Sequence, residues 1–259
     1  MNQQLKSAMK RLNLSGMMAT LEVRLNEAMG NQLSHLEFLE LIVNDEIAVR
    51  EDRAIARRLK AARFRELKSL EEFDFSFNPR INRRNIMEMA TCRFVREHRD
   101  ILFTGPPGVG KSHLAQAIGH QAARIGFTVM YRSIFDAVAE LGQAEVFGEI
   151  AKILRKYLKP DLLIIDDMGL KRLPKNSGEY LFEIIMRRFE LRSTIMTSNR
   201  PLDEWGKLIG DVPTATAILD RFLSRAEVVQ ITGKSYRLKD RATGVMQNDN
   251  IKTRAEEKS

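Results

Sequence analysis

One run of eight residues constrains the fold of this chain more than any other feature. The run is Gly105-Pro106-Pro107-Gly108-Val109-Gly110-Lys111-Ser112. It fits the pattern G-x-x-x-x-G-K-[ST], lies after the apolar residues Ile101–Phe103 and precedes a helical pattern over His113–Arg124. Glycines let the backbone turn its N–H groups inward around an anion, and a helix that begins there points its positive end at the same place. The run therefore predicts a phosphate-binding loop between a strand and a helix.

The residue types in this loop indicate which phosphate compound binds. Lys111 supplies a point charge to the β and γ phosphates of a nucleotide, and the hydroxyl of Ser112 is placed to ligate Mg²⁺. We therefore expect ATP and Mg²⁺ as cofactors. The expected nucleotide contacts are Gly105, Pro106, Pro107, Gly108, Val109, Gly110, Lys111, Ser112 and His113.

Two carboxylates follow a second apolar strand. Leu162–Ile165 is a continuous apolar run, and Asp166 and Asp167 come directly after it. The carboxyl ends of parallel strands face the ligand crevice of an α/β sheet. We expect Asp166 to hold Mg²⁺ together with Ser112, and Asp167 to polarise the attacking water.

Two further side chains complete the expected catalytic set of Asp167, Asn199 and Arg221. Asn199 ends the run Thr197-Ser198-Asn199 after a third strand, where its amide could position the lytic water. Arg221 lies in the helix before the last strand and could act as an arginine finger on the ATP of a neighbouring subunit. Arg188 and Arg225 are rivals for that role.

The order of the patterns beyond residue 100 predicts the fold class. Short apolar strands alternate with helical patterns, which is typical of an α/β protein with a parallel sheet covered on both faces. The expected strands are 101–103, 127–132, 162–165, 194–197 and 227–231. The expected helices are 113–124, 134–159 in two pieces that break near Gly142, 178–191 and 214–225.

The remaining stretches indicate the domain organisation. Residues 1–70 carry helical spacing, with Ser34 as a cap, and predict a small all-α domain for assembly, DNA or partner contact. Residues 71–80 suggest an extended linker, and a helix is expected over 83–96. We expect the ATPase domain to cover 81–240 and a disordered tail to cover 241–259.

A net charge of +8 favours a polyanionic partner. Residues 1–75 carry equal numbers of acidic and basic side chains, but Arg50, Arg53 and Arg57 recur at helical spacing and share one face. Such a stripe can follow a phosphate backbone. The expected DNA contacts are Arg50, Arg53, Arg57, Arg58, Lys60, Arg63, Lys171, Arg172 and Lys175.

Composition argues against several classes of protein. No apolar run approaches the length of about 18 residues that a membrane span needs. The first residues carry Lys6, Lys10 and Arg11 without an apolar block, so no secretory signal is expected. Cys92 is the only cysteine, which excludes an intramolecular disulfide. We expect a cytoplasmic protein with no membrane contact.

The motifs, in this order, resemble those of the AAA+ ATPases. The Asp166-Asp167 pair is similar to that of the DnaA/DnaC initiator and helicase-loader clade. Within that clade, the sequence of several stretches resembles the IstB-like family of insertion-sequence helper ATPases. The stretches that carry this resemblance are Leu12–Met17, Arg57–Phe64, Leu70–Phe75, Gly105–Ser112 and Leu162–Gly169. The first three stretches are more specific for this family than the glycine-rich loop, because nucleotide binding does not require those residues.

The resemblance implies fold details and partners. It implies a five-stranded parallel sheet with a central P-loop strand, a helical N-terminal domain, and no C-terminal lid. It implies an ATPase that oligomerises on duplex DNA regardless of sequence and assists a transposase in target-site selection. It also assigns Arg221 as the finger and Asn199 as the sensor, places Phe73–Phe77 near the adenine, and leaves Arg237 as the only stand-in for a lid arginine.

Three other readings of the residues stay open. A helicase loader like DnaC shares the ATPase core and differs in the partner. A small-molecule kinase needs an acceptor site and a lid, and the sequence offers neither. A scaffold that binds ATP without hydrolysing it conflicts with the presence of Asp166, Asp167 and Asn199.

Overall fold

The computed structural model describes residues 3–170, 173–174 and 177–239. The chain divides into two compact units, which meet in sequence between Arg58 and Leu59. The expected DNA contacts Lys171, Arg172 and Lys175 and the tail at 241–259 lie outside the described residues. No helix within the described ranges is both long and apolar enough to span a membrane.

The N-terminal unit is helical, as the spacing of its apolar residues predicts. It contains α1 (Gln3–Arg11), α2 (Ser15–Gly30) and most of α3 (His35–Ala62). Ser34 caps α3, because its Oγ accepts from Glu37 N at 3.3 Å while the Glu37 carboxylate accepts from Ser34 N at 2.7 Å. Its core is small and centres on Met9, Leu21 and Ile42.

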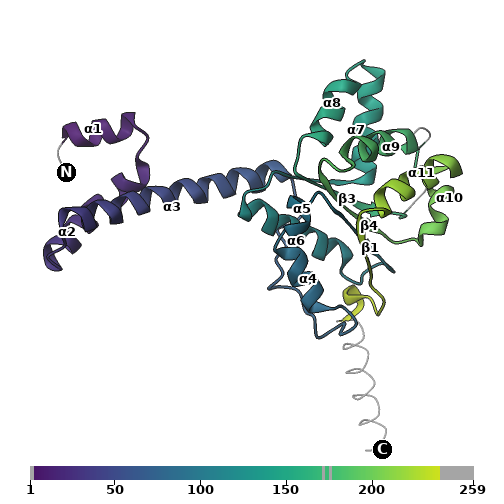
Figure 1. The fold of residues 1–259 in the computed structure, drawn as a ribbon, viewed down its shortest axis with the longest axis horizontal. Helices are drawn as coiled ribbons and strands as arrows, with labels where there is room; N and C mark the ends of the chain where they lie inside the picture. Colours follow the sequence, from purple (N-terminus) through teal and green to yellow (C-terminus); the bar gives the residue numbers. More distant parts are fainter. Residues whose placement is uncertain (1–2, 171–172, 175–176, 240–259) are drawn as a thin grey trace, which may run out of the picture. The chain divides into compact units, whose positions relative to one another are not determined.

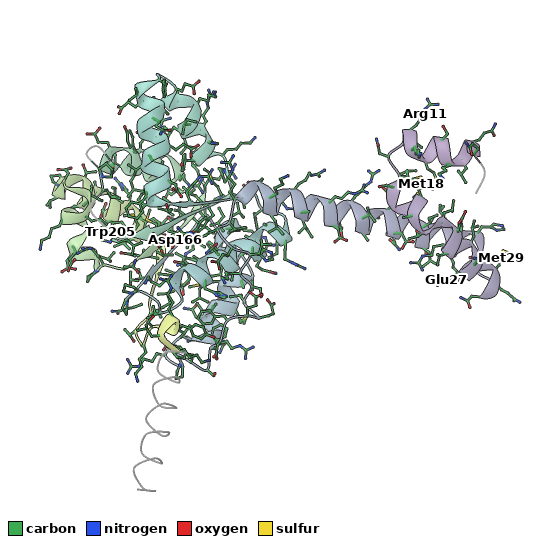
Figure 2. All side chains as sticks on the ribbon, turned by 180° about the vertical axis from the view of Figure 1, so that it is seen from behind. Arg11, Met18, Glu27, Met29, Asp166 and Trp205 are labelled. Atoms are coloured by element: carbon green, nitrogen blue, oxygen red, sulfur yellow. The ribbon has the colours of Figure 1, made fainter. Side chains whose placement is uncertain are left out.

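A buried carboxylate joins α2 to α3. The Glu46 side chain accepts hydrogen bonds from Gly16 N at 2.6 Å and Met17 N at 3.2 Å, so it satisfies the first amides of α2. A Cβ atom at Gly16 would lie 2.7 Å from the Asp45 carbonyl oxygen, so only glycine permits this close approach of the two helices. Met29, at the far end of α2, is 80% exposed (Figure 2).

The second unit contains a five-stranded parallel sheet, which confirms the predicted fold class. The strands are β1 (Asp100–Thr104), β2 (Val129–Ser133), β3 (Leu162–Met168), β4 (Ser193–Ser198) and β5 (Ala226–Gln230). Their order is β2-β3-β4-β1-β5, with every neighbouring pair parallel. The strand before the glycine-rich loop, β1, is interior, although β4 occupies the middle position.

Helices cover both faces of this sheet (Figure 1). The helices that pack with one core cluster are α4 (Arg83–Ala90), α5 (Arg93–Arg96) and α6 (Lys111–Ile125). Those that pack with the other are α7 (Ile134–Val146), α8 (Ile150–Leu158), α9 (Ser177–Arg188), α10 (Trp205–Ile209) and α11 (Val212–Leu223). Successive side chains of each strand point to opposite faces of the sheet. In β1, Ile101 and Phe103 pack in the core cluster with α4, α5 and α6, and Leu102 packs in the cluster on the other face. Two short 3₁₀ segments are η1 (Leu202–Glu204) and η2 (Tyr236–Leu238).

Three local predictions are wrong. The break in 134–159 falls between Val146 and Ile150, and Gly142 lies inside α7, where the buried residues on both sides of it hold the helix together. The helix expected over 83–96 is divided at Cys92, which adopts a left-handed φ of 57°. Residues 71–80 form turns where an extended linker was expected, and Asp74 Oδ1 accepts from the amides of Ser76 and Phe77.

Arg188 links the amino ends of β3 and β4 through hydrogen bonds. Its side chain is 1% exposed, and Nη1 donates to the carbonyl oxygens of Tyr157 and Pro160 at 2.9 Å each. Nη2 donates to the carbonyl of Ser193, and Nε donates to Thr194 Oγ1 at 3.1 Å. A buried cation is tolerated here because nearly every N–H it carries has an acceptor.

We predict that Arg188→Ala lowers the free energy of unfolding by about 3 kcal/mol, because it leaves several buried carbonyls without a donor. The neighbouring Arg187→Ala is the matched control, since the Arg187 side chain is 58% exposed and pairs with Glu183 at the surface, and it should change stability by less than about 0.5 kcal/mol. Urea unfolding followed by the fluorescence of Trp205, the single tryptophan, measures both. Equal stabilities of the two variants would contradict this role for Arg188.

Candidate nucleotide-binding site

The glycine-rich loop leaves the carboxyl end of β1 and enters α6, as predicted. Gly108 and Gly110 adopt φ values of 84° and 103°, which other residues rarely reach. Val109 is buried between them and anchors the loop in the core. The helical bonding of α6 begins with Leu114 N donating to Gly110 O at 3.0 Å, so the three amides before Leu114 point out of the helix end. These amides can face an anion.

The side chain of Lys111 reaches back from the start of α6 to the first residues of the loop. Its ammonium donates to the carbonyl oxygens of Gly105 and Pro106, at 2.7 Å each, and its side chain is almost fully buried. Burial lowers the pKa of Lys111 to about 8, while Asp166 and Asp167 act in the opposite direction. The side chain therefore remains mostly cationic at pH 7, as a phosphate-binding lysine requires.

Asp166 is the most constrained group of the site. Its carboxylate is fully buried and accepts from Ser112 Oγ at 2.8 Å, from Tyr131 Oη at 2.6 Å, and from Thr197 Oγ1. Figure 2 marks Asp166 in the second unit. The pair Ser112 and Asp166 is thus brought together as expected, while Tyr131 and Thr197 are contacts that the sequence patterns did not single out. A hydroxyl and a carboxylate at this spacing form the oxygen donor set that Mg²⁺ prefers, so the residues fit the ion.

Asp167 lies at a β-bulge within β3. The pairing of β3 with β4 shifts between Ile165 and Met168, and Asp167 adopts a left-handed φ of 67°. Its amide donates to Asp166 Oδ1 at 3.0 Å and to Thr197 Oγ1 at 3.1 Å, which holds this strained backbone in place. Burial and the adjacent Asp166 raise the pKa of the Asp167 carboxyl.

Asn199 directly follows β4. Its backbone N–H donates to the carbonyl oxygen of Met168, the last residue of β3, at 2.9 Å. The structure therefore places the expected sensor residue and the expected magnesium and water-polarising carboxylates along one edge of the sheet.

Residues after β5 pass over the glycine-rich loop. Tyr236 N donates to Gly108 O at 2.9 Å, and a Cβ at Gly108 would lie 2.0 Å from Ser235 Oγ. The charge of Arg237 adds to the lowering of the pKa of Lys111. It also opposes the net rise in the pKa of Asp167, so Arg237 lies within electrostatic reach of both residues. No pattern in the sequence predicts this contact of the C-terminal segment with the loop.

Aromatic side chains from residues 73–77 flank the loop on another side. A Cβ at Gly110 would lie 2.6 Å from the Phe73 ring, and the Phe73 ring centroid is 5.2 Å from that of His113. The His113 ring nitrogen Nε2 is 2.8 Å from Ser69 O, so the imidazole contacts the segment that precedes Phe73. The structure thus places Phe73 beside the glycine-rich loop, and the location of Phe73–Phe77 near the adenine, which the resemblance implies, stays a prediction.

The three candidate finger arginines differ in their contacts within the part of the chain that the structure describes. Arg188 is buried among carbonyls, and Arg225 pairs with Glu190 at 3.2 Å and donates to Glu97 O. Arg221 is exposed in the last turn of α11, with its guanidinium 5.7 Å from the centroid of the Phe189 ring.

The expected DNA contacts of the N-terminal unit share a face of α3. Arg50, Arg53 and Arg57 line an open hollow of about 630 Å³ together with Leu12 and Asn13. Arg50 pairs with Glu46 at 2.7 Å, and Arg53 donates to Ser15 Oγ. In the second unit Lys60 and Arg63 are exposed, while Arg58, the last residue of the N-terminal unit, is half-buried.

Solved structures share the fold of the second unit. The AMPPCP-bound DnaA from Aquifex aeolicus is 23% identical with a TM-score of 0.56, over 71% of this chain and 56% of that one. The crystal structure of DnaI is 22% identical with a TM-score of 0.53, over 64% of this chain and 91% of that one. This chain spans little more than half of the DnaA structure. The sheet order and the glycine-rich loop at β1 place the second unit in the AAA+ class of P-loop folds.

Sequence comparison then identifies the family. Residues 7–244 match the model of the IstB-like ATP binding proteins. Curated relatives named for ATP binding and for their insertion sequences include that of IS5376 from Geobacillus stearothermophilus, 38% identical over 89% of this chain and 92% of the relative. Another is that of IS21 from Pseudomonas aeruginosa, 35% identical over 94% of this chain and 92% of the relative. The chain belongs to the IstB-like ATP-binding family, as the resemblance of its motifs predicted.

We predict that Lys111→Ala abolishes ATP binding, because it removes the buried ammonium from the loop. Lys207→Ala, which removes an exposed lysine from α10, is the control and should bind ATP like the unchanged protein. Equilibrium dialysis with labelled ATP gives the affinities. Retention of the unchanged affinity by Lys111→Ala would show that the loop is not the nucleotide site.

Proposed function

We propose that the chain hydrolyses ATP with Mg²⁺ at the carboxyl edge of its sheet. The observation that carries the proposal is the buried Asp166 carboxylate, which accepts a hydrogen bond from Ser112 of the phosphate-binding loop. Ser112 and Asp166 would hold the ion, which when bound neutralises charge on the phosphates. Lys111 binds the β and γ phosphates, Asp167 polarises the attacking water, and Asn199 positions that water.

The location of Arg221 supports action on a neighbouring subunit. Arg221 lies near the start of β5, and the ring of Phe189, which it faces, precedes β4. Both positions are at the amino edge of a parallel sheet, whereas the glycine-rich loop follows the carboxyl end of β1. The five-residue β1 spans about 16 Å. An arginine there cannot reach the ATP of its own subunit, so we propose that ATP drives self-association and that Arg221 completes the site of the next subunit.

The proposed partners are duplex DNA and a transposase. Exposed basic residues of the segment 50–63 contact DNA phosphates, so binding is sensitive to salt and indifferent to sequence. They include Arg53, Arg57, Lys60 and Arg63. The names of the relatives, all tied to insertion sequences, support a role in transposition, in which the ATP-bound oligomer marks a target site for the transposase. Hydrolysis then lets the oligomer disassemble.

A helicase loader remains the alternative on the same ATPase core. The family match covers residues 7–244 and therefore includes nearly all of the N-terminal unit, where partner choice between the two functions resides. This favours the transposition helper. Pull-down with the cognate transposase and with a replicative helicase separates the two, and capture of the helicase alone would contradict our proposal.

We predict that Asp167→Asn lowers kcat for ATP by about 10²-fold while ATP and DNA binding persist, because the amide cannot polarise water as the carboxylate does. Asp203→Asn, on an exposed residue of η1, is the control and should turn over normally. Phosphate release measures the rates. An unchanged rate for Asp167→Asn would remove Asp167 from this role.

We predict that Arg221→Ala and Lys111→Ala are each inactive alone and recover ATPase activity when mixed. Lys111→Ala subunits still carry Arg221 and can complete the intact loop of an Arg221→Ala neighbour. A mixture of Arg221→Ala with the double variant that carries both substitutions should stay inactive, because neither chain offers the finger. Failure of every mixing ratio to restore activity would argue against the arrangement across subunits.

A further inference from the structure

Arg65 contacts the carboxylate proposed to activate water. Its Nη1 atom lies 3.5 Å from Asp167 Oδ2, and the two residues are 102 positions apart in sequence. The Arg65 side chain is 60% exposed, whereas that of Asp167 is 15% exposed. The arginine therefore approaches the site from the solvent side and covers one oxygen of Asp167.

The backbone on both sides of Arg65 is anchored to the helix that carries Ser112. The Phe64 ring packs on α6, where a Cβ at Gly119 would lie 3.0 Å from its Cε1 atom. Glu66 N donates to Gln116 Oε1 at 3.2 Å, and Gln116 Nε2 donates to Ser112 O at 3.2 Å. These backbone anchors place Arg65 beside Asp167, while its own side chain is largely exposed to solvent.

The pair is weak enough to be exchanged. An ion pair of 3.5 Å with a largely exposed arginine contributes little in water. A guanidinium binds phosphate oxygens in a bidentate manner and with comparable or greater strength. Lys60 and Arg63, both exposed and both proposed to contact DNA, lie five and two residues before Arg65. A duplex bound there brings phosphates to the segment that carries Arg65.

We propose that Arg65 restrains Asp167 in the resting subunit, and that the phosphates of duplex DNA draw Arg65 away and free the carboxylate for hydrolysis. The inference rests on the proposed function, because it requires Asp167 to act on water. Arg65 is then a positioning residue that acts through Asp167. The other charged groups that influence the pKa of Asp167 are Asp166 on β3, Lys111 on α6 and Arg237 in η2. Among these groups, Arg65 is the one that lies next to the proposed DNA contacts Lys60 and Arg63 in the sequence.

The test compares steady-state ATPase kinetics of the full chain with and without duplex DNA. Arg65→Ala should raise the DNA-free kcat by about fivefold, equivalent to about 1 kcal/mol, and bring it close to the DNA-saturated rate. The KM for ATP should stay within about twofold, because binding of the nucleotide does not use Arg65. Arg65→Lys should restore most of the restraint, since it returns a cation to the same position. Arg93→Ala, which removes an exposed arginine paired with Glu97 on α5, is the charge-matched control and should behave like the unchanged protein.

Two results would overturn the inference. One is an unchanged ratio of DNA-stimulated to DNA-free kcat in Arg65→Ala. The other is a raised KM with a lowered kcat, which would make Arg65 a nucleotide contact. Failure of the proposed function is distinguishable from both, because Asp167→Asn would then turn over ATP at the unchanged rate in the same assay.

Discussion

The fully buried carboxylate of Asp166 is the constraint on which the site depends. A charge without access to water is costly unless hydrogen bonds compensate it, and here three hydroxyl groups do so. They come from α6, β2 and β4, through Ser112, Tyr131 and Thr197. The carboxylate thus fixes the start of the phosphate-binding helix relative to three neighbouring strands. Because Thr197 Oγ1 also accepts from the amide of Asp167, the same cluster sets the position of the second carboxylate.

Arginine side chains lie at both edges of the parallel sheet, and their surroundings differ between the two edges. At the carboxyl edge lie the glycine-rich loop, the two aspartates and the solvent-exposed Arg65. At the amino edge the buried Arg188 donates hydrogen bonds to backbone carbonyls, while Arg221 is exposed at the end of α11. Under the proposed self-association, the exposed Arg221 at one edge of a subunit would complete the nucleotide site at the opposite edge of the next subunit.

The parts of this site that lie close together in sequence could be predicted, and those joined by the fold could not. The glycine-rich loop, the Asp166-Asp167 pair and the five strands are each marked by a local pattern, and the structure confirms the predicted fold class. Tyr131 meets Asp166 across 35 residues and Arg65 meets Asp167 across 102, and no local pattern signals either contact. The wrong break at Gly142 has a different cause. Glycine costs a helix about 1 kcal/mol, and the burial of Val138 and Leu141 on α7 outweighs that cost.

We propose that ATP bound between subunits drives assembly on duplex DNA. Mass photometry of the unchanged chain with a duplex of unrelated sequence, in ATP, in ADP and without nucleotide, tests it most directly, with Lys111→Ala as the control. We predict particles of several subunits on DNA in ATP only, and their loss in Lys111→Ala. Assemblies of equal size in all three conditions would contradict it.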